Sequence, residues 1–501
     1  MSTSTPEREV VADDAIAGDE ITVDETHRLH GNLGTLQLVI TVLAMNAPLG
    51  ITVAVAPLVI AFGFGLNAPL LYLVLAAVIA LFAVGYATMS RVIPRAGAFY
   101  TFITAGLGRP VGLGSGFLAI IVYTAGLAYT LLFVGITAET IFATTLNLTV
   151  PWWVGSIVIA LVIAVLGYLR ISSSVKVLGV LLALEVIAVL VYDAVVVFQG
   201  GSGDAVPGIF SFDPQFLTFA GIGLGAVLAL TSFSGIETTA IFRDEVRDPR
   251  KTVPRATYIA VAIIGAFYAV QSWVIIQGFG AQNVLGAIFQ NPAGAVVENI
   301  GTYLGAAGRD VVVILIVTST FASLTSLHNV IARYAFNLAR DGVLPKAFAL
   351  PHPRFGSPYR ASVVLSIVTL LFLVVVAVAR LDPNTLFVQL SGSTGFALIV
   401  LFVLAAAAIV AYLARTKVAG ANVWHRFVAP IVSAVILAGI AVFAAVNLDT
   451  VTSSTLYTGG PALNIAAIAV VVVSVLLGVI VALVVRTRNR AAYERIGTEH
   501  A

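Results

Sequence analysis

The chain has 501 residues, of which 59% are hydrophobic and only 10% are charged, and its formal net charge is +2. Soluble domains carry about 25% charged residues, so this composition excludes a soluble globular protein. The absence of cysteine excludes disulfides, thiolate catalysis and cysteine-based metal sites. Several uncharged stretches reach the roughly 20 residues that a helix needs to cross a bilayer, so we predict a polytopic helical membrane protein.

Residues 1–32 are rich in acids and have no periodic apolar pattern, which predicts a disordered acidic tail. They lack the basic segment and short apolar core of a signal peptide. We therefore expect the first membrane helix to remain in the mature protein.

Hydropathy predicts twelve membrane-spanning helices, at residues 36–63, 68–90, 113–143, 152–169, 175–198, 216–242, 256–279, 309–335, 360–380, 385–413, 427–447 and 461–485. With a cytoplasmic N-terminus, all of the 26 basic residues except Arg309 and Arg380 fall on the cytoplasmic side. This charge distribution predicts a multi-pass protein of the cytoplasmic (inner) membrane with both termini in the cytoplasm. Of the longer connections, 94–108 is predicted as a short helix under the membrane and 281–305 as a two-helix lid. An ordinary surface loop is the alternative for each.

Two of these spans contain residues that interrupt helices. Residues 45–50 of the first span include Pro48 and Gly50, and residues 231–237 of the sixth include Gly235 and Glu237. Proline removes a backbone donor and glycine weakens a helix interior. Non-helical backbone persists at membrane depth only where it is buried in protein or lines a wet cavity. Because five spans separate the two helices, they run in opposite directions, as in inverted-repeat transporters whose broken helices form a midplane site. A simple kink in each helix is the alternative.

Three motifs carry a resemblance to a known family: PRAGAFY at 94–100, FSGIE at 233–237 with the charged segment 244–256, and RYAF at 333–336 with 339–345. The sequence resembles the amino acid–polyamine–organocation (APC) superfamily, specifically bacterial amino acid permeases, over about residues 33–360. The resemblance implies an all-α membrane protein with a LeuT-type 5+5 inverted-repeat fold and twelve transmembrane helices. It divides the chain into an acidic tail (1–32), a ten-helix transport core (33–413), two additional helices (414–486) and a cytoplasmic tail (487–501).

The resemblance also implies alternating access and a substrate site at the two breaks. The substrate-binding candidates are Asn46, Ala47, Pro48, Leu49, Gly50, Ser232, Phe233, Ser234, Gly235, Ile236 and Glu237. Phe233 is also a candidate gate. Many family members have Gly-Ser-Gly-Ile where this chain has Pro-Leu-Gly-Ile at 48–51, and their exposed amides there hold the substrate carboxylate. Pro48 has no amide hydrogen and Leu49 has no hydroxyl, which leaves room for an amine, an alkanolamine or another small organic solute.

Inserting a carboxylate at the centre of a membrane helix costs about 2.5 to 3.5 kcal/mol on insertion scales, so each such residue is expected to have a structural or functional role. Glu237 either caps the second half of the sixth helix or binds a substrate ammonium or a proton. Glu185 falls, by the resemblance, near a position where some proton-coupled members carry a lysine in place of a sodium ion. It is a candidate to carry the coupling proton, with a structural hydrogen bond as the alternative. Relatives that use sodium suggest Ser323 and Ser326 as weaker cation candidates.

The sequence thus predicts a secondary active transporter of amino acids or related amines, working as a proton-coupled symporter or an exchanger. A polyamine or alkanolamine transporter and a non-transporting nutrient sensor of the same fold are the alternatives. An enzyme is not expected, because the six histidines are scattered without metal-ligand spacing. We accordingly predict no catalytic residue, metal or cofactor. The expected partners are a small-molecule substrate, a proton or less favourably sodium, and the lipid bilayer, but no nucleic acid.

Overall fold

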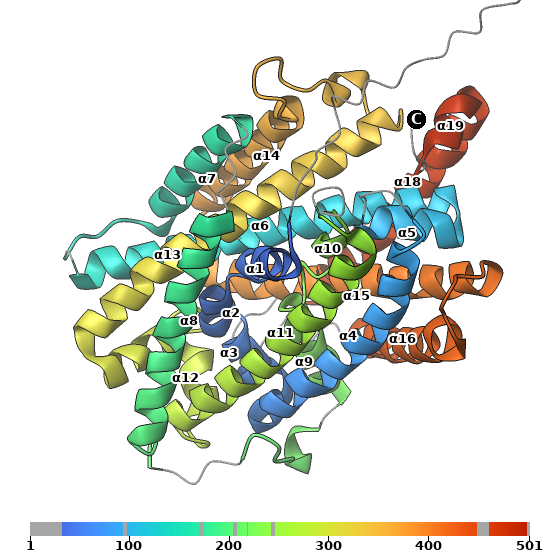
Figure 1. The fold of residues 1–501 in the computed structure, drawn as a ribbon. Helices are drawn as coiled ribbons and strands as arrows, with labels where there is room; N and C mark the ends of the chain where they lie inside the picture. Colours follow the sequence, from blue (N-terminus) through green and yellow to red (C-terminus); the bar gives the residue numbers. More distant parts are fainter. Residues whose placement is uncertain are drawn as a thin grey trace, which may run out of the picture.

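The structure is a computed structural model that describes residues 33–93, 98–145, 147–169, 175–203, 208–217, 219–241, 246–447 and 460–497. The predicted acidic tail, residues 94–97 of the first motif and residues 244–245 of the second lie outside the described residues. Every regular element in the described part of the chain is a helix (Figure 1). The longest helices are α4 (Ala68–Ser90), α6 (Arg109–Thr145), α7 (Trp152–Leu169), α8 (Val175–Phe198), α11 (Pro249–Phe279), α13 (Ala295–Arg340), α14 (Tyr359–Val378), α15 (Pro383–Arg415), α16 (Ala429–Val446) and α18 (Gly460–Arg488).

Among the described residues, 11 helices are long and apolar enough to cross a membrane. The difference from the twelve predicted spans lies in the sixth, 216–242, which is divided into α9 (Phe219–Thr231) and α10 (Thr238–Ile241). The apolar part of α9 is too short to cross a bilayer alone. The all-helical membrane fold is therefore confirmed, and the sixth predicted span is a broken helix.

The first predicted span is also broken, more narrowly than the sequence suggested. α1 (Thr35–Asn46) and α2 (Pro48–Ala54) are separated by Ala47 alone, whose φ of 47° and ψ of 73° are left-handed. Pro48 is the first residue of α2, where a helix does not use the missing N–H. Gly50 lies inside α2 and takes no part in the break. In the sixth span, residues 232–237 form successive turns, and Gly235 has a φ of 98° that favours glycine.

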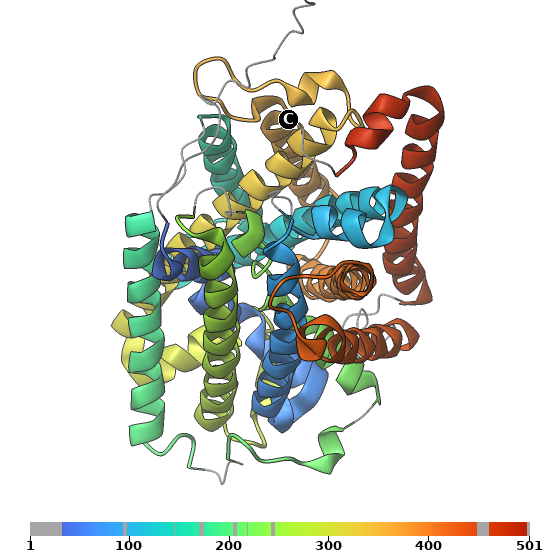
Figure 2. The same ribbon diagram turned by 45° about the vertical axis from the view of Figure 1, so that its right-hand side comes forward.

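The two broken helices meet in the middle of the molecule. α1 contacts α10, and α3 (Ala56–Val59), which continues α2, contacts α9. Figure 1 shows α1 and α2 at the centre, with α8, α11 and α13 around them. Helices five spans apart also pack as pairs: α4 with α11, α6 with α13, and α7 with α14. Figure 2 shows the first of these pairs side by side. This pairing is consistent with the inverted repeat of five helices that the resemblance implies.

Both long connections contain the helices that the sequence predicted. Segment 94–108 includes α5 (Ala98–Leu107), whose Phe99 and Phe102 are buried, so α5 is packed into the protein instead of lying on its surface. Segment 281–305 forms α12 (Val284–Gln290) and the start of α13, which bends at Gly305 where φ is 72°. The predicted tail 487–501 contains α19 (Arg490–Arg495), and the Gly497 N–H donates to Asp341 Oδ2 at 3.2 Å.

The contact between α5 and α15 provides a test of the packing. A Cβ added at Gly106 would lie 2.1 Å from the backbone oxygen of Ala408. We expect Gly106→Ala to destabilise the protein by about 1 to 3 kcal/mol, because one of the two backbones must move. Gly439→Ala on α16 is the matched control, since no atom lies within 4 Å of its added Cβ. The thermal unfolding midpoint of the purified protein should fall only for Gly106→Ala, and equal midpoints for both variants would show that this contact is wrong.

Candidate functional site

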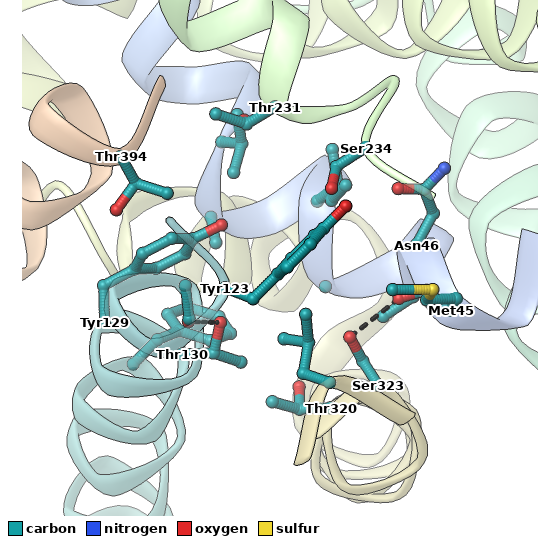
Figure 3. Close-up of a pocket in the computed structure, with 18 of the residues that line it drawn as sticks. Met45, Asn46, Tyr123, Tyr129, Thr130, Thr231, Ser234, Thr320, Ser323 and Thr394 are labelled. Carbon is teal, nitrogen blue, oxygen red and sulfur yellow. Dashed lines mark hydrogen bonds between the residues drawn. The ribbon is translucent and has the colours of Figure 1, made fainter. Parts of the chain in front are cut away.

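A cavity lies where the two helix breaks meet (Figure 3). Its walls come from α1, α2 and residues 231–234 of the two broken helices, and from α6, α13 and α15. Its volume is about 80 Å³. A cavity needs roughly 10 to 15 Å³ to hold one water, so this one has room for more than a single water.

The structure brings some of the predicted residues to this cavity and not others. Those that line it are Asn46, Ala47, Gly50, Ser234 and Ser323. Those outside its lining are Pro48, Leu49, Glu185, Ser232, Phe233, Gly235, Ile236, Glu237 and Ser326. Phe233, the candidate gate, is 0% exposed and does not face the cavity.

Sequence reasoning missed the walls that α6 and α15 contribute. From α6 the main residues are Tyr123, Gly126, Tyr129, Thr130 and Phe133, and from α15 they are Phe387 and Thr394. Neither helix is broken or carries a membrane-embedded acid at this level. The available signal was a stripe of aromatic, glycine and hydroxyl residues at positions 123, 126, 130 and 133, which share one helix face.

Glu237 ties the broken sixth helix to its neighbours. Its carboxylate accepts hydrogen bonds from the hydroxyl of Tyr123 and from the Gly235 N–H, the latter at 3.0 Å. The hydroxyl of Tyr86 on α4 donates to its backbone oxygen at 2.9 Å. The residue is 1% exposed. Because both carboxylate oxygens accept hydrogen bonds from neighbouring elements and the residue is outside the cavity lining, this geometry suits the structural alternative.

Glu185 lies between three helices. From α8 its carboxylate faces the hydroxyl of Ser319 on α13 and the Leu49 N–H at the start of α2. It is 4% exposed. Neither Glu185 Oε2 nor Ser319 Oγ has a hydrogen-bond partner of good geometry among the described residues. The carboxylate and the hydroxyl therefore lie close together without a well-formed hydrogen bond. A carboxylate placed in this way can change its protonation state without breaking an ion pair.

The two sodium candidates occupy different surroundings. Ser323 Oγ donates to the Met45 backbone oxygen at 2.7 Å, which links α13 to the last turn of α1 (dashed in Figure 3). Ser326 Oγ donates to the Ala322 oxygen of its own helix at 3.0 Å. Of the two hydroxyls, therefore, only that of Ser323 bonds to the first helix.

Comparison with known proteins identifies the family of this chain. The family model described as amino acid permease matches residues 33–417. An uncharacterized transporter of Mycobacterium tuberculosis is 30% identical over 348 residues, which are 69% of this chain and 74% of that protein. The low-affinity putrescine importer PlaP of Escherichia coli is 23% identical over 320 residues, 62% of this chain and 69% of PlaP. The branched-chain amino acid permease BcaP of Bacillus subtilis is 25% identical over 307 residues, 58% of this chain and 63% of BcaP. These matches confirm the resemblance, and the chain belongs to the amino acid permease family of membrane transporters.

Proposed function

We propose that this protein is a secondary active transporter that moves amino acids or related amines across the bacterial cytoplasmic membrane by alternating access, coupled to a proton. The observation that carries the proposal is the cavity between the two helix breaks, in a chain of the amino acid permease family. Discontinuous helices in transporters offer carbonyl and N–H ends to a substrate at the midplane. The basic residues favour an orientation in which α5 and both termini are cytoplasmic.

The break in the first helix is better suited to an ammonium than to a carboxylate. The end of α1 carries a partial negative charge that favours a cation. At the start of α2, Pro48 has no N–H and the Leu49 N–H faces Glu185, so Gly50, which lines the cavity, is the one residue of this turn left with a backbone N–H for the substrate. Asn46 also lines the cavity, with its side-chain oxygen, an acceptor for an ammonium, toward Ser234 (Figure 3).

The same turn of α2 supports coupling between a proton and the substrate. Leu49 faces Glu185, and its neighbour Gly50 lines the cavity. A change in the charge of Glu185 therefore acts on the backbone next to the bound substrate. In the proposed mechanism, substrate and proton stabilise the same arrangement of α2 against α8 and α13, so they cross the membrane together.

The proposal is tested with purified protein in liposomes and a panel of radiolabelled amino acids and amines. We expect at least one of them to accumulate when the side of entry is made acidic, and collapse of the pH gradient by an ionophore to abolish the accumulation. Binding of a ligand without flux under any gradient would contradict transport and favour the nutrient-sensor alternative.

The scarcity of hydrogen-bond donors for a substrate carboxylate predicts how amines and amino acids compete for binding. We expect an amine to compete for binding at least as well as the amino acid with the same side chain, because few donors are left for the carboxylate. Isobutylamine and valine make a suitable pair. If only intact α-amino acids compete, Pro48 does not weaken the binding of a substrate carboxylate.

A further inference from the structure

The cavity has two ends with different chemistry (Figure 3). Met45, Asn46 and Ser323 lie at one end, beside the break in the first helix. Tyr129 and Thr394 lie at the opposite end, which is formed by α6 and α15. We call these the break end and the far end. A substrate held by its ammonium at the break end places the rest of its side chain at the far end.

Among the residues that the structure describes, none places a charge at the far end that could pair with a charged side chain. None of the described residues that line the cavity is Asp, Glu, Lys, Arg or His. The nearby Glu237 is not in the lining, and its carboxylate is engaged by Tyr123 and Gly235. Placing an unpaired ion in such surroundings is strongly unfavourable.

The far end is apolar but offers a neutral hydrogen-bonding group. The rings of Phe133 and Phe387 stack with centroids 5.7 Å apart, and the ring of Tyr129 lies 6.2 Å from that of Phe387. Thr394 is 6% exposed, and its Oγ1 has no hydrogen-bond partner among the described residues. Thr320 also lines the cavity, and its hydroxyl is likewise without a partner among the described residues. Buried hydroxyls are nearly always hydrogen-bonded, so these two, which a change of rotamer can turn into the cavity, are suited to a ligand.

We propose that the far end selects substrates with an uncharged side chain, and that Thr394 binds a neutral polar group when the side chain carries one. The protein then accepts neutral amino acids and monoamines and excludes dibasic amino acids and diamines. This inference rests on the proposed function and narrows its substrate class. It also separates this chain from its relative PlaP, which is named as a putrescine importer.

The test uses ligand pairs that differ only at the distal end. Norleucine is lysine without its side-chain ammonium, and butylamine is putrescine without its second ammonium. We expect norleucine and butylamine to bind the purified protein at least about tenfold more tightly than their charged counterparts, measured by competition or thermal shift. Equal or tighter binding of lysine or putrescine overturns the inference and leaves the proposed function standing. If no amino acid or amine binds or is transported, the proposed function itself fails.

Two variants of Thr394 test the residue directly. Thr394→Asp supplies the missing counter-charge, and we expect it to raise the ratio of lysine to norleucine affinity by about tenfold or more. Thr487→Asp adds the same charge at the exposed end of α18 and should leave that ratio unchanged. Thr394→Val keeps the shape and removes only the hydroxyl, so norleucine binding should persist while binding of ε-hydroxynorleucine weakens. Unchanged preferences in both Thr394 variants, with wild-type unfolding midpoints, would show that Thr394 does not determine specificity.

Discussion

Glu185→Gln is expected to abolish accumulation driven by a pH gradient while exchange of substrate across the membrane continues. Glutamine has nearly the same shape and can still accept a hydrogen bond from the Leu49 N–H, but it cannot take up and release a proton. One proton carried per substrate across one pH unit can sustain about tenfold accumulation. In liposomes the variant should only equilibrate the labelled substrate, with no response to the gradient.

The matched control for this experiment is Glu139→Gln. Glu139 is an exposed carboxylate near the C-terminal end of α6. Its replacement therefore removes the same chemical group at a position that is not part of the contacts between Glu185, Ser319 and Leu49. We expect wild-type accumulation from this control. Gradient-driven uptake that is unchanged in Glu185→Gln would contradict the coupling role. Loss of exchange together with a lower unfolding midpoint would point to the structural alternative, a hydrogen bond that holds α8 in place.

Gly126→Leu is expected to eliminate substrate binding without destabilising the fold. No heavy atom outside its own helix turn lies within 4 Å of a Cβ added at Gly126, and the residue lines the cavity. A leucine side chain would occupy much of a cavity of about 80 Å³, so too little space remains for a substrate. We expect affinity to fall by about a hundredfold or more, while the unfolding midpoint stays within the range of the wild type.

Gly439→Leu separates the effect of occlusion from that of adding a large side chain to a helix. Gly439 lies on α16, away from the cavity, and also has open space around an added Cβ. Its leucine variant should bind and transport normally. Equal affinity in Gly126→Leu and wild type would mean that the substrate binds somewhere other than this cavity.

The breaks could be predicted because backbone chemistry alone determines where these helices weaken. Pro48 cannot donate to the preceding turn, and Gly235 can adopt the positive φ that the turn requires. Their spacing also predicted correctly that the first and sixth helices would meet. The exact width of the first break was not predictable, because Ala47 adopts its left-handed conformation only in its tertiary context.

The other side of the cavity could not be predicted, because it depends on which helix faces pack together. The stripe on α6 that contains Gly126 and Thr130 looks the same in sequence as one that packs against another helix. Similarly, Phe233 beside the break suggested a gate, but the turn buries its side chain. The membrane acids Glu185 and Glu237 were identified by the cost of charge in a bilayer, and their different partners were visible only in the structure.

The location of the bound substrate is the central claim, and a cryo-electron microscopy map of the protein with a saturating ligand tests it most directly. We predict ligand density in the cavity between Asn46, Ser234 and Thr320, in contact with the backbone of Gly50. Density for the ligand at another site, with this cavity empty of it, would contradict the claim.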